Sequence, residues 1–398
     1  MIEVVKLGDI CTMQSGGTPR RNKSEYYQGG SIPWAKIGDI ENANDNYLTE
    51  TKELITELGL KSINNRLFPK GTLLFAMYGS VGKTAIAGRE LSTNQAILGI
   101  QPKSNFLDTK YLQYWLNRQL KDLQNQSRGV ALKNLSATIM KNQEIPLPPL
   151  STQKKITTIL DRADALRQND KKILEKYDQL AKSLFLEMFG DPVRNEKGWE
   201  HVLFGNVVKD IIGGKSIGGE ERSLKEGELA VLKISSVTKG EFDNTQYKVV
   251  SNPLSNIKLI MPRQGDLLFS RANTRELVGA TCIVDKDYDQ FFLPDKLWRL
   301  ELDNKLANSH YIKFLLSDKK FRDTLTKTAT GTSGSMLNIS KVKLRSLHIP
   351  LPPIELQMRF QRAMKKIEEQ KNLTKNSLQK SEELFQSLLQ RAFRGELL

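Results

Sequence analysis

The stretch IPLPPLSTQKKI, residues 145–156, occurs a second time in this chain of 398 residues as IPLPPIELQMRF, residues 349–360. Upstream of each copy, further stretches match in the same order. The matching pairs are KYLQYWL (110–116) with HYIKFLL (310–316), GTLLF (71–75) with GDLLF (265–269), IPWAKIGDI (32–40) with LAVLKISSV (229–237), and the glycine pair 16–17 with 213–214. The chain is therefore a duplication of a unit of about 200 residues, which is too long for a solenoid repeat.

Each copy has two parts. The first mixes short β-branched or aromatic runs with Gly/Asn-rich loops and one amphipathic helix, which predicts an α+β domain. The expected strands include 72–76, 96–100, 267–270 and 296–302, and the expected helices are 108–121 and 308–320. The second part begins after the paired prolines, where Ser151 can cap a helix in the first copy, and helical periodicity then continues to Phe189.

Heptad spacing of apolar residues predicts a coiled-coil seam along both long helical segments. One track in the first segment is Ile156, Ala163, Tyr177 and Leu184, and a second is Ile159, Leu166, Ile173 and Leu180. In the second segment the tracks are Phe360, Ile367 and Leu388, and Met364, Leu378 and Phe385, with Leu384 also assigned to the seam.

A charged helix with one apolar seam cannot shield that seam from water alone, so the two segments are expected to pair with each other. An antiparallel pair would separate two pseudo-symmetric α+β domains, whereas a parallel pair would place them side by side. We expect the antiparallel arrangement. The predicted division is a first α+β domain (1–150), a central helix (151–190), a second α+β domain (191–353) and a C-terminal helix (354–398).

The formal net charge is +15 at pH 7, and the excess of basic residues is spread over both copies. A field of this sign favours a polyanionic partner, nucleic acid above all, although it also serves solubility. The sequence contains no apolar stretch of about 18 residues and no signal-peptide core, so we expect a cytoplasmic protein without membrane contact. Cys11 and Cys282 share no metal-binding or redox motif and are expected to be buried thiols.

The string GSVGKT, residues 79–84, imitates a phosphate-binding loop, but the pattern G-x-x-x-x-G-K-[ST] requires a glycine where Met77 stands. The matching stretch of the second copy, LLFSRANTRELVGATCI (267–283), contains no Gly-Lys-Thr. If both copies share one function, that function does not need Lys83 and Thr84 as a nucleotide-phosphate site. Nucleotide hydrolysis is therefore disfavoured.

The stretch LPDKLWRLELDNK, residues 293–305, imitates a metal-dependent nuclease, which needs two carboxylates converging on a divalent ion. The first copy has Gln95, Lys103 and Asn105 at the places of Asp295, Asp303 and Lys305, so it lacks every ligand of such a site. The histidines lie in unrelated places without triad or metal spacing: His201, His310 and His348. The sequence predicts no catalytic residue and no metal site.

Two basic, loop-rich domains on a stiff frame suit a bipartite reader of duplex DNA. The order SGGTPRRNKSEYYQGGSIPWAKIGDI (15–40), GTLLFAMYGSVGKTAI, STNQAIL, IPLPPLSTQKKI and then a long helix resembles the specificity subunits of Type I restriction-modification systems. The second half repeats it with GGKSI, LAVLKISSVTKGEF, GDLLFSRAN, LPDKLWRL and IPLPPIELQ. The ending SLLQRAFRGEL is also typical of that family.

The resemblance implies a non-catalytic subunit whose recognition domains each read one half of an interrupted DNA site, while the helices act as a spacer and docking platform. It also implies two methyltransferase (modification) subunits, which bind S-adenosylmethionine and methylate adenine at N6, and restriction subunits that use ATP and Mg. This chain itself is expected to hold no cofactor. The alternatives are a stand-alone bipartite DNA-binding regulator and a protein-binding scaffold.

The residues expected to contact DNA are loop cations, amides and hydroxyls at matching places of the two copies. In the first copy they are Arg20, Arg21, Lys36, Tyr78, Ser80, Lys83 and Gln95. In the second they are Lys215, Lys233, Arg271, Asn273, Arg275 and Lys296. Trp34 and Trp298 are expected to be core aromatics rather than base-stacking groups.

Overall fold

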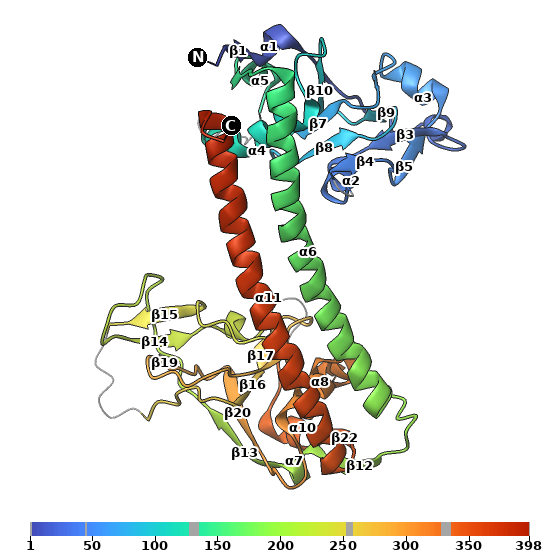
Figure 1. Ribbon diagram of the computed structural model, residues 1–398. Coiled ribbons are helices and arrows are strands. Elements are labelled where there is room, and N and C mark those ends of the chain that lie inside the picture. The colour runs from blue at the N-terminus through green and yellow to red at the C-terminus, as the bar shows by residue number, and fades with distance from the viewer. Residues whose placement is uncertain (1, 44–45, 127–134, 252–257, 328–335, 398) are drawn as a thin grey trace. The chain divides into compact units, whose positions relative to one another are not determined.

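The computed structural model describes residues 2–43, 46–126, 135–251, 258–327 and 336–397 (Figure 1). The chain forms two compact units: unit 1 comprises residues 1–171 and 376–398, and unit 2 comprises residues 172–375. Two long helices, α6 (Leu150–Phe189) and α11 (Ile354–Arg394), each contribute one part to unit 1 and the other part to unit 2.

The two helix parts in unit 1 run antiparallel. The guanidinium of Arg167 on α6 lies 4.2 Å from the ring centroid of Phe385 on α11. One helical turn later on α6, Lys171 forms an ion pair of 3.2 Å with Glu382, which precedes Phe385 on α11. Contacts that advance along one helix while they retreat along the other define an antiparallel pair.

The helix parts in unit 2 follow the same rule. Lys371 of α11 forms an ion pair of 2.7 Å with Asp178 of α6. Further along α6, the ring of Phe185 packs 5.8 Å from that of Phe360, which lies earlier on α11. The predicted antiparallel pairing is therefore confirmed inside each unit.

Only one of the two apolar tracks predicted on α6 lies in the packed face. Ile156 and Ala163 are buried, whereas Leu166 is 54% and Leu180 50% exposed. On a helix with 3.6 residues per turn, a track that starts at Ile159 begins on the flank of the buried face. It then turns about 20° further away with each heptad. The predicted seam positions Leu166 and Leu180 were wrong for this reason, and Ile159 and Ile173 are only half-buried.

On α11 the assignment of Leu384 to the seam was also wrong. Leu384 is 47% exposed, and the neighbouring Phe385 occupies the buried position. Phe360 and Ile367 are buried in the core of unit 2, as predicted.

Unit 1 is built from two sheets, with strand orders β2-β10-β7-β8-β4 and β5-β3-β9-β6, and a separate β1-β11 pair. Its strands are β1 (Val4–Lys6), β2 (Cys11–Ser15), β3 (Ile32–Ala35), β4 (Tyr47–Leu48), β5 (Glu53–Ile55), β6 (Leu67–Phe68), β7 (Leu73–Ala76), β8 (Thr84–Ala87), β9 (Leu91–Thr93), β10 (Ile97–Pro102) and β11 (Glu144–Pro146). Its shorter helices are α1 (Leu7–Ile10), α2 (Ile37–Glu41), α3 (Glu57–Ser62), α4 (Thr109–Gln126), α5 (Ala137–Lys141) and the 3-10 turn Ser24–Tyr26.

Unit 2 has sheets ordered β13-β20-β16-β18 and β15-β14-β19, and the pairs β12-β22 and β17-β21. Its strands are β12 (Glu200–Leu203), β13 (Val208–Gly213), β14 (Leu229–Leu232), β15 (Tyr247–Val250), β16 (Leu267–Ser270), β17 (Ala272–Asn273), β18 (Thr281–Ile283), β19 (Phe291–Phe292), β20 (Leu297–Leu302), β21 (Leu337–Asn338) and β22 (His348–Leu351). Its shorter helices are α7 (Phe204–Val207), α8 (Ser309–Ser317), α9 (Lys319–Lys327), α10 (Lys341–Arg345) and the 3-10 turn Ile234–Ser236.

The strand orders establish the duplication in three dimensions, because β2-β10-β7-β8 recurs as β13-β20-β16-β18 and β5-β3-β9 recurs as β15-β14-β19. The parallel pairing of β3 with β9 also recurs between β14 and β19. The expected α+β class is therefore correct. The single helix expected over residues 308–320 is interrupted at Asp318, whose extended backbone separates α8 from α9.

The glycine match is displaced by one residue from the predicted alignment. The amide of Gly17 donates to the Thr93 carbonyl at 2.8 Å, and the amide of Lys215 donates to the Leu293 carbonyl at 3.1 Å. Gly17 therefore corresponds to Lys215, and Gly16 corresponds to Gly214 rather than to Gly213. A Cβ atom on Gly214 would lie 1.8 Å from the Leu293 carbonyl oxygen, so only glycine fits this close approach.

A buried glutamine joins each long helix to the domain that precedes it. The Nε2 of Gln153 donates to the carbonyls of Phe106 (2.7 Å) and Pro148 (2.8 Å), and its Oε1 accepts from the amide of Asp108 at 2.9 Å. In unit 2, Gln357 makes the corresponding three bonds at 3.1, 2.7 and 2.8 Å. Both side chains are fully buried, so each amide group needs these backbone partners because it cannot bond to water.

The remaining expectations about the core are met. Trp34 is 1% and Trp298 5% exposed, and the indole of Trp34 donates to the Gly17 carbonyl at 3.0 Å. Cys11 and Cys282 are buried free thiols, and burial raises the pKa of each to about 12. Among the described residues, no helix combines the length and the apolar character needed to cross a bilayer.

We expect Gln153→Leu to destabilise unit 1 by roughly 3 kcal/mol, because it removes three hydrogen bonds and leaves the Pro148 carbonyl buried without a partner. Urea unfolding and the hydrogen-exchange rate of the Asp108 amide measure the effect. Gln168→Leu, at an exposed position of α6, is the control and should change stability little. A loss of less than about 1 kcal/mol for Gln153→Leu would refute the assigned role.

The corrected seam predicts different costs for two leucines on the same helix. Leu160→Ala should cost about 3 kcal/mol, because Leu160 is fully buried and its removal leaves a cavity. Leu166→Ala should cost less than about 1 kcal/mol, because its side chain is exposed. Denaturant unfolding of both variants checks this, and equal losses would restore the original assignment of Leu166.

Candidate nucleic-acid interface

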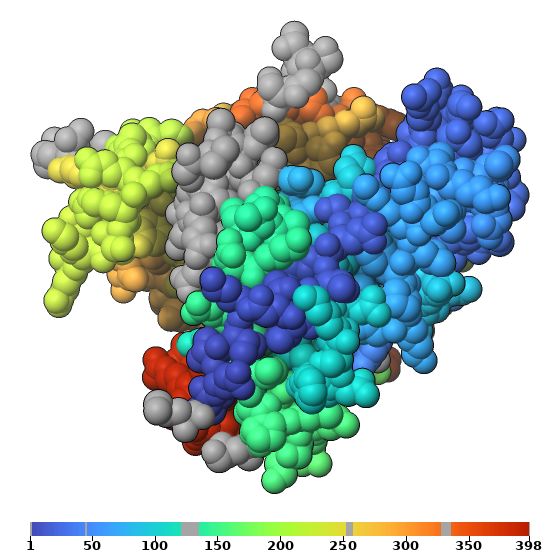
Figure 2. Space-filling view, turned by 90° about the horizontal axis from the view of Figure 1, so that it is seen from above, coloured from blue at the N-terminus to red at the C-terminus, as the bar shows by residue number. Residues whose placement is uncertain are grey.

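The antiparallel pairing of strands in the main sheet of unit 1 brings three loops together at one end of the strands. β2 and β7 end there, and their neighbours β10 and β8 begin there. We call the loops 16–23, 77–83 and 94–96 edge 1. The parallel strands β3 and β9 also end at this place, so Lys36 joins edge 1. Figure 2 shows that the blue to cyan segments of unit 1, which are distant in sequence, share one continuous surface.

The duplication produces the same edge in unit 2. Here β13 and β16 end where β20 and β18 begin, and we call the loops 214–219, 271–280 and 294–296 edge 2. The parallel pair β14 and β19 brings Lys233 to it. Each edge therefore gathers the candidate residues of its own copy, and a role in DNA contact remains a prediction.

The GSVGKT string forms a β-hairpin loop between β7 and β8. The amide of Gly82 donates to the Ala76 carbonyl at 2.9 Å, and Gly79 and Gly82 have positive φ angles of 64° and 90°. A phosphate-binding loop instead leads from a strand into a helix, whose N-terminal amides hold the phosphate. β8 follows here, so the hairpin has the wrong geometry for a nucleotide site.

Edge 1 holds exposed side chains and side chains with fixed partners. Arg20, Lys83 and Gln95 are exposed, and the Thr18 hydroxyl donates to Gln95 Oε1. Tyr78 is half-buried against the core of unit 1. The Ser80 hydroxyl donates to Glu41.

Arg21 and Lys36 share one carboxylate, that of Glu53. Burial opposes ionisation of Glu53, but hydrogen bonds from Lys36 and Arg21 outweigh it and lower its pKa. The Arg21 guanidinium also lies 4.9 Å from the Tyr27 ring and 4.7 Å from the Trp34 ring. Both predicted cations are therefore positioned groups rather than freely solvated charges.

In edge 2, Lys215 and Arg275 are exposed, and Lys296 is half-buried. Lys233 forms an ion pair of 2.8 Å with Glu221. The Oδ1 of Asn273, which is half-buried, accepts from the next backbone amide, that of Thr274, at 2.8 Å.

Arg271 is the most tightly held predicted residue of edge 2. Its Nε donates to the Asp295 carbonyl (2.9 Å), its Nη2 to Asp295 Oδ2 (3.1 Å) and its Nη1 to Asn338 Oδ1 (3.0 Å). The Ser216 hydroxyl donates to the other carboxylate oxygen of Asp295.

The structure also separates the two carboxylates of the nuclease-like stretch. Asp295 precedes β20 and Asp303 follows it, so the two carboxylates lie at opposite ends of a six-residue strand and do not converge. Asp303 instead accepts from the Lys305 amide at 3.1 Å in a turn, as expected from the sequence. No group of three potential metal-ligating side chains occurs within the described part of the chain.

Several residues at the edges were missed by sequence reasoning. Thr18 and Ser216 are hydroxyl residues at matching places of the two copies, so a corrected repeat alignment would have found them. Glu53 and Asn338 carry no sequence signal, because only the folded chain brings them to Arg21 and Arg271.

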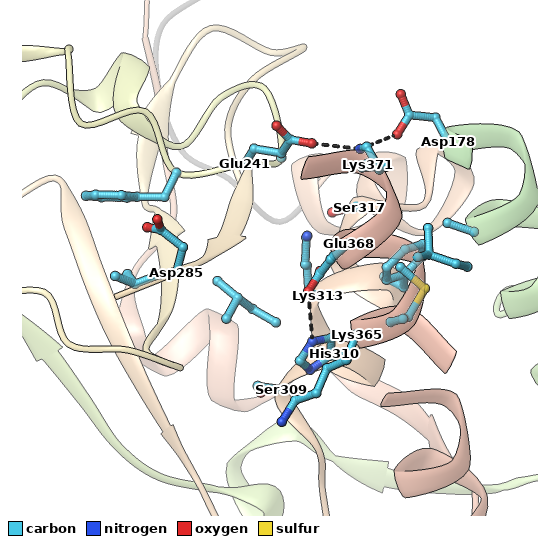
Figure 3. Close-up of a pocket in the computed structure, with 18 of the residues that line it drawn as sticks. Asp178, Glu241, Asp285, Ser309, His310, Lys313, Ser317, Lys365, Glu368 and Lys371 are labelled. Carbon is cyan, nitrogen blue, oxygen red and sulfur yellow. Dashed lines mark hydrogen bonds and ion pairs between the residues drawn. The ribbon is translucent and has the colours of Figure 1, made fainter. Parts of the chain in front are cut away.

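Unit 2 also contains a cavity of about 1030 Å³ between α8, its parts of α6 and α11, and the loop 238–242 (Figure 3). Glu241 of this loop bonds to Lys371 and Lys375, and Lys371 also bonds to Asp178. His310 lies 3.8 Å from Glu368. The ion pairs of Glu241 attach the loop between β14 and β15 to α11.

Comparisons with known proteins agree with this duplicated architecture. The family model described as the Type I restriction modification DNA specificity domain matches residues 2–177 and 196–383. The MjaIX specificity subunit of Methanocaldococcus jannaschii is 28% identical over 88% of this chain and 84% of its own length. The EcoKI specificity subunit of Escherichia coli K12 is 26% identical over 99% and 89%.

Among solved structures, an S subunit of a Type I restriction-modification system from M. genitalium superposes with a TM-score of 0.58 at 14% identity. The match covers 98% of this chain and 96% of that one. At this level of identity, the likeness concerns the fold.

Glu241→Gln should lower the melting temperature of unit 2 at neutral pH. Burial opposes ionisation of Glu241, but bonds from Lys371 and Lys375 outweigh it and lower its pKa from 4.5 to about 2. The ion pairs therefore stabilise the fold above pH 4.5, and this contribution is lost as the pH falls towards 2. Glu241 is half-exposed, so the contribution is under about 1 kcal/mol.

Differential scanning calorimetry of wild type and variant at pH 7, 5 and 3 measures the difference. The difference in melting temperature should be similar at pH 7 and 5, smaller at pH 3, and reduced by high salt. Glu226→Gln, at an exposed position of unit 2, is the control. A difference that grows as the pH falls would contradict the assignment.

Proposed function

The chain belongs to the Type I restriction-modification DNA specificity family, and from this premise we propose that edge 1 and edge 2 each read one half of an interrupted duplex DNA site. The chain is the specificity subunit, and it contributes sequence recognition rather than catalysis. In this proposal, residues 1–150 and 191–353 are the two recognition domains. We also place the protein in the cytoplasm, where host DNA is accessible.

The proposal rests on one observation: the two edges occupy equivalent places in the fold but carry different side chains. Equivalent strands of the two units position the loops of both edges, so both edges can meet a DNA groove in the same way. Yet Gln95 stands where Asp295 stands in the other copy, and Met77 stands where Arg271 does. Different donors and acceptors read different bases, so we expect the half-sites to differ in sequence.

The exposed faces of the long helices supply a second part of the proposal. Leu166 and Leu180 are large apolar side chains that the packed seam of α6 leaves exposed. We infer that such positions help to dock two methyltransferase subunits, which carry S-adenosylmethionine and methylate adenine. Restriction subunits with ATP and Mg would complete the enzyme. The helices would then fix the spacing between the half-sites.

Two other functions remain as competitors. A stand-alone DNA-binding regulator would bind its site with high affinity without a methyltransferase subunit. A protein-binding scaffold would lack the salt-dependent DNA affinity that phosphate contacts produce.

Exchanging residues 1–150 for the same region of a relative should alter only one half of the methylated motif, because each edge lies within its own copy. The exchanged chain is expressed with its methyltransferase subunits, and methylated adenines are mapped in host DNA. A change in both halves would contradict the two-reader proposal.

Controls separate the competing functions. The purified chain alone should neither methylate nor cleave DNA, and its DNA affinity should fall steeply with salt. Full affinity and specificity without methyltransferase subunits would favour the regulator, and salt-independent or absent DNA binding would favour the scaffold.

A further inference from the structure

Arg271 differs from the other cations of edge 2, because its position is fixed on several sides. Asp295 accepts from its Nε and Nη2, and Asn338 accepts from its Nη1. The guanidinium also lies 5.7 Å from the Trp298 ring centroid. Burial opposes ionisation of Asp295, but hydrogen bonds from Ser216 and Arg271 outweigh it and hold its pKa below the ordinary value. Arg271 therefore faces a charged, anchored carboxylate.

The bonds to Asp295 and Asn338 leave part of the guanidinium unused. A guanidinium carries five N–H groups. Three of those on Arg271 are donated, and Nη1 and Nη2 each retain one N–H that no described residue accepts. The side chain is 25% exposed, so it remains accessible from solvent at edge 2.

Two N–H groups on neighbouring nitrogens match the O6 and N7 acceptors of guanine in the major groove. A phosphate is a poorer partner here, because the Asp295 carboxylate, 3.1 Å from Nη2, would repel its negative oxygens. The guanine acceptors carry only partial negative charge, so the carboxylate repels them much less. The exposed cations Lys215 and Arg275 are better suited to the backbone.

Unit 1 has no arginine at the position equivalent to Arg271. The amide of Met77 donates to the Ala96 carbonyl as that of Arg271 donates to the Lys296 carbonyl, so the two positions are equivalent. Met77 is 3% exposed and has no donor in its side chain. Any base preference due to Arg271 must therefore belong to the half-site of unit 2 alone.

We propose that Arg271 reads a guanine in the half-site of unit 2, and that Asp295 and Asn338 are positioning residues that present its guanidinium to the base. The proposal rests on the proposed function and adds the base and the residue that reads it.

The test selects preferred sequences from randomised duplexes with the full chain in complex with its methyltransferase subunits. Arg271→Lys should reduce the preference for guanine at one position about 10- to 100-fold, because an ammonium cannot replace the bidentate fork. Arg271→Gln should shift that position towards adenine. All other positions and the salt dependence should stay unchanged.

Asp295→Asn tests the positioning role. It should weaken the preference at the same position, and the double variant with Arg271→Lys should be no worse than Arg271→Lys alone, since both act through one contact. Melting temperatures verify that each variant folds. Arg194→Ala removes an exposed, ion-paired arginine outside edge 2 and is the matched control.

Three results would overturn the proposal. In the first, Arg271→Lys weakens binding to all duplexes equally and lowers the salt slope by about 1, which marks a phosphate contact. In the second, neither Arg271 variant changes the preferred sequence. In the third, the altered position lies in the half-site of unit 1. The proposed function itself fails by a different result, namely that the wild-type complex selects no sequence at all.

Discussion

The apolar seam of each long helix must be removed from water, and both units are built around this requirement. α6 and α11 are amphipathic, and packing of the apolar face supplies most of the stability of such helices in proteins. In unit 1, Ile156, Leu160 and Phe385 enter the same core as the main sheet. In unit 2, Phe185 and Phe360 do so. The helices are thus part of the core of each unit, and Gln153 and Gln357 tie the start of each helix to the segment before it.

The helix parts and the sheets share one core in each unit. The loops of edge 1 and edge 2 connect strands that the core already holds, so their side chains can change without loss of the fold. The two copies illustrate this freedom. Met77 is part of the core of unit 1, whereas Arg271 at the same place is a half-buried cation held by Asp295. One scaffold can therefore carry two different sets of side chains at equivalent edges.

Much of the fold could be predicted from the sequence, and the failures have physical causes. The strand at Leu267–Ser270 was predicted at its observed bounds, because a short apolar run between turn residues leaves little choice. The buried positions of the seam were predicted less well, because α6 carries two apolar tracks and heptad spacing does not determine which track is buried. Leu160 lies in the buried face and Leu166 outside it, a result that depends on what the rest of unit 1 presents.

By itself, the sequence determined the duplication, the α+β class, the two long helices, the positive charge, and the absence of a complete phosphate-binding motif at GSVGKT. These are local or periodic properties, and they can be read without knowing which distant residues meet. Only the tertiary structure decided that Glu53 holds Arg21 and Lys36, and that Asp295 and Asn338 hold Arg271. Side-chain contacts of this kind join residues far apart in the chain, so they exist only after sheet pairing has set the register of each edge.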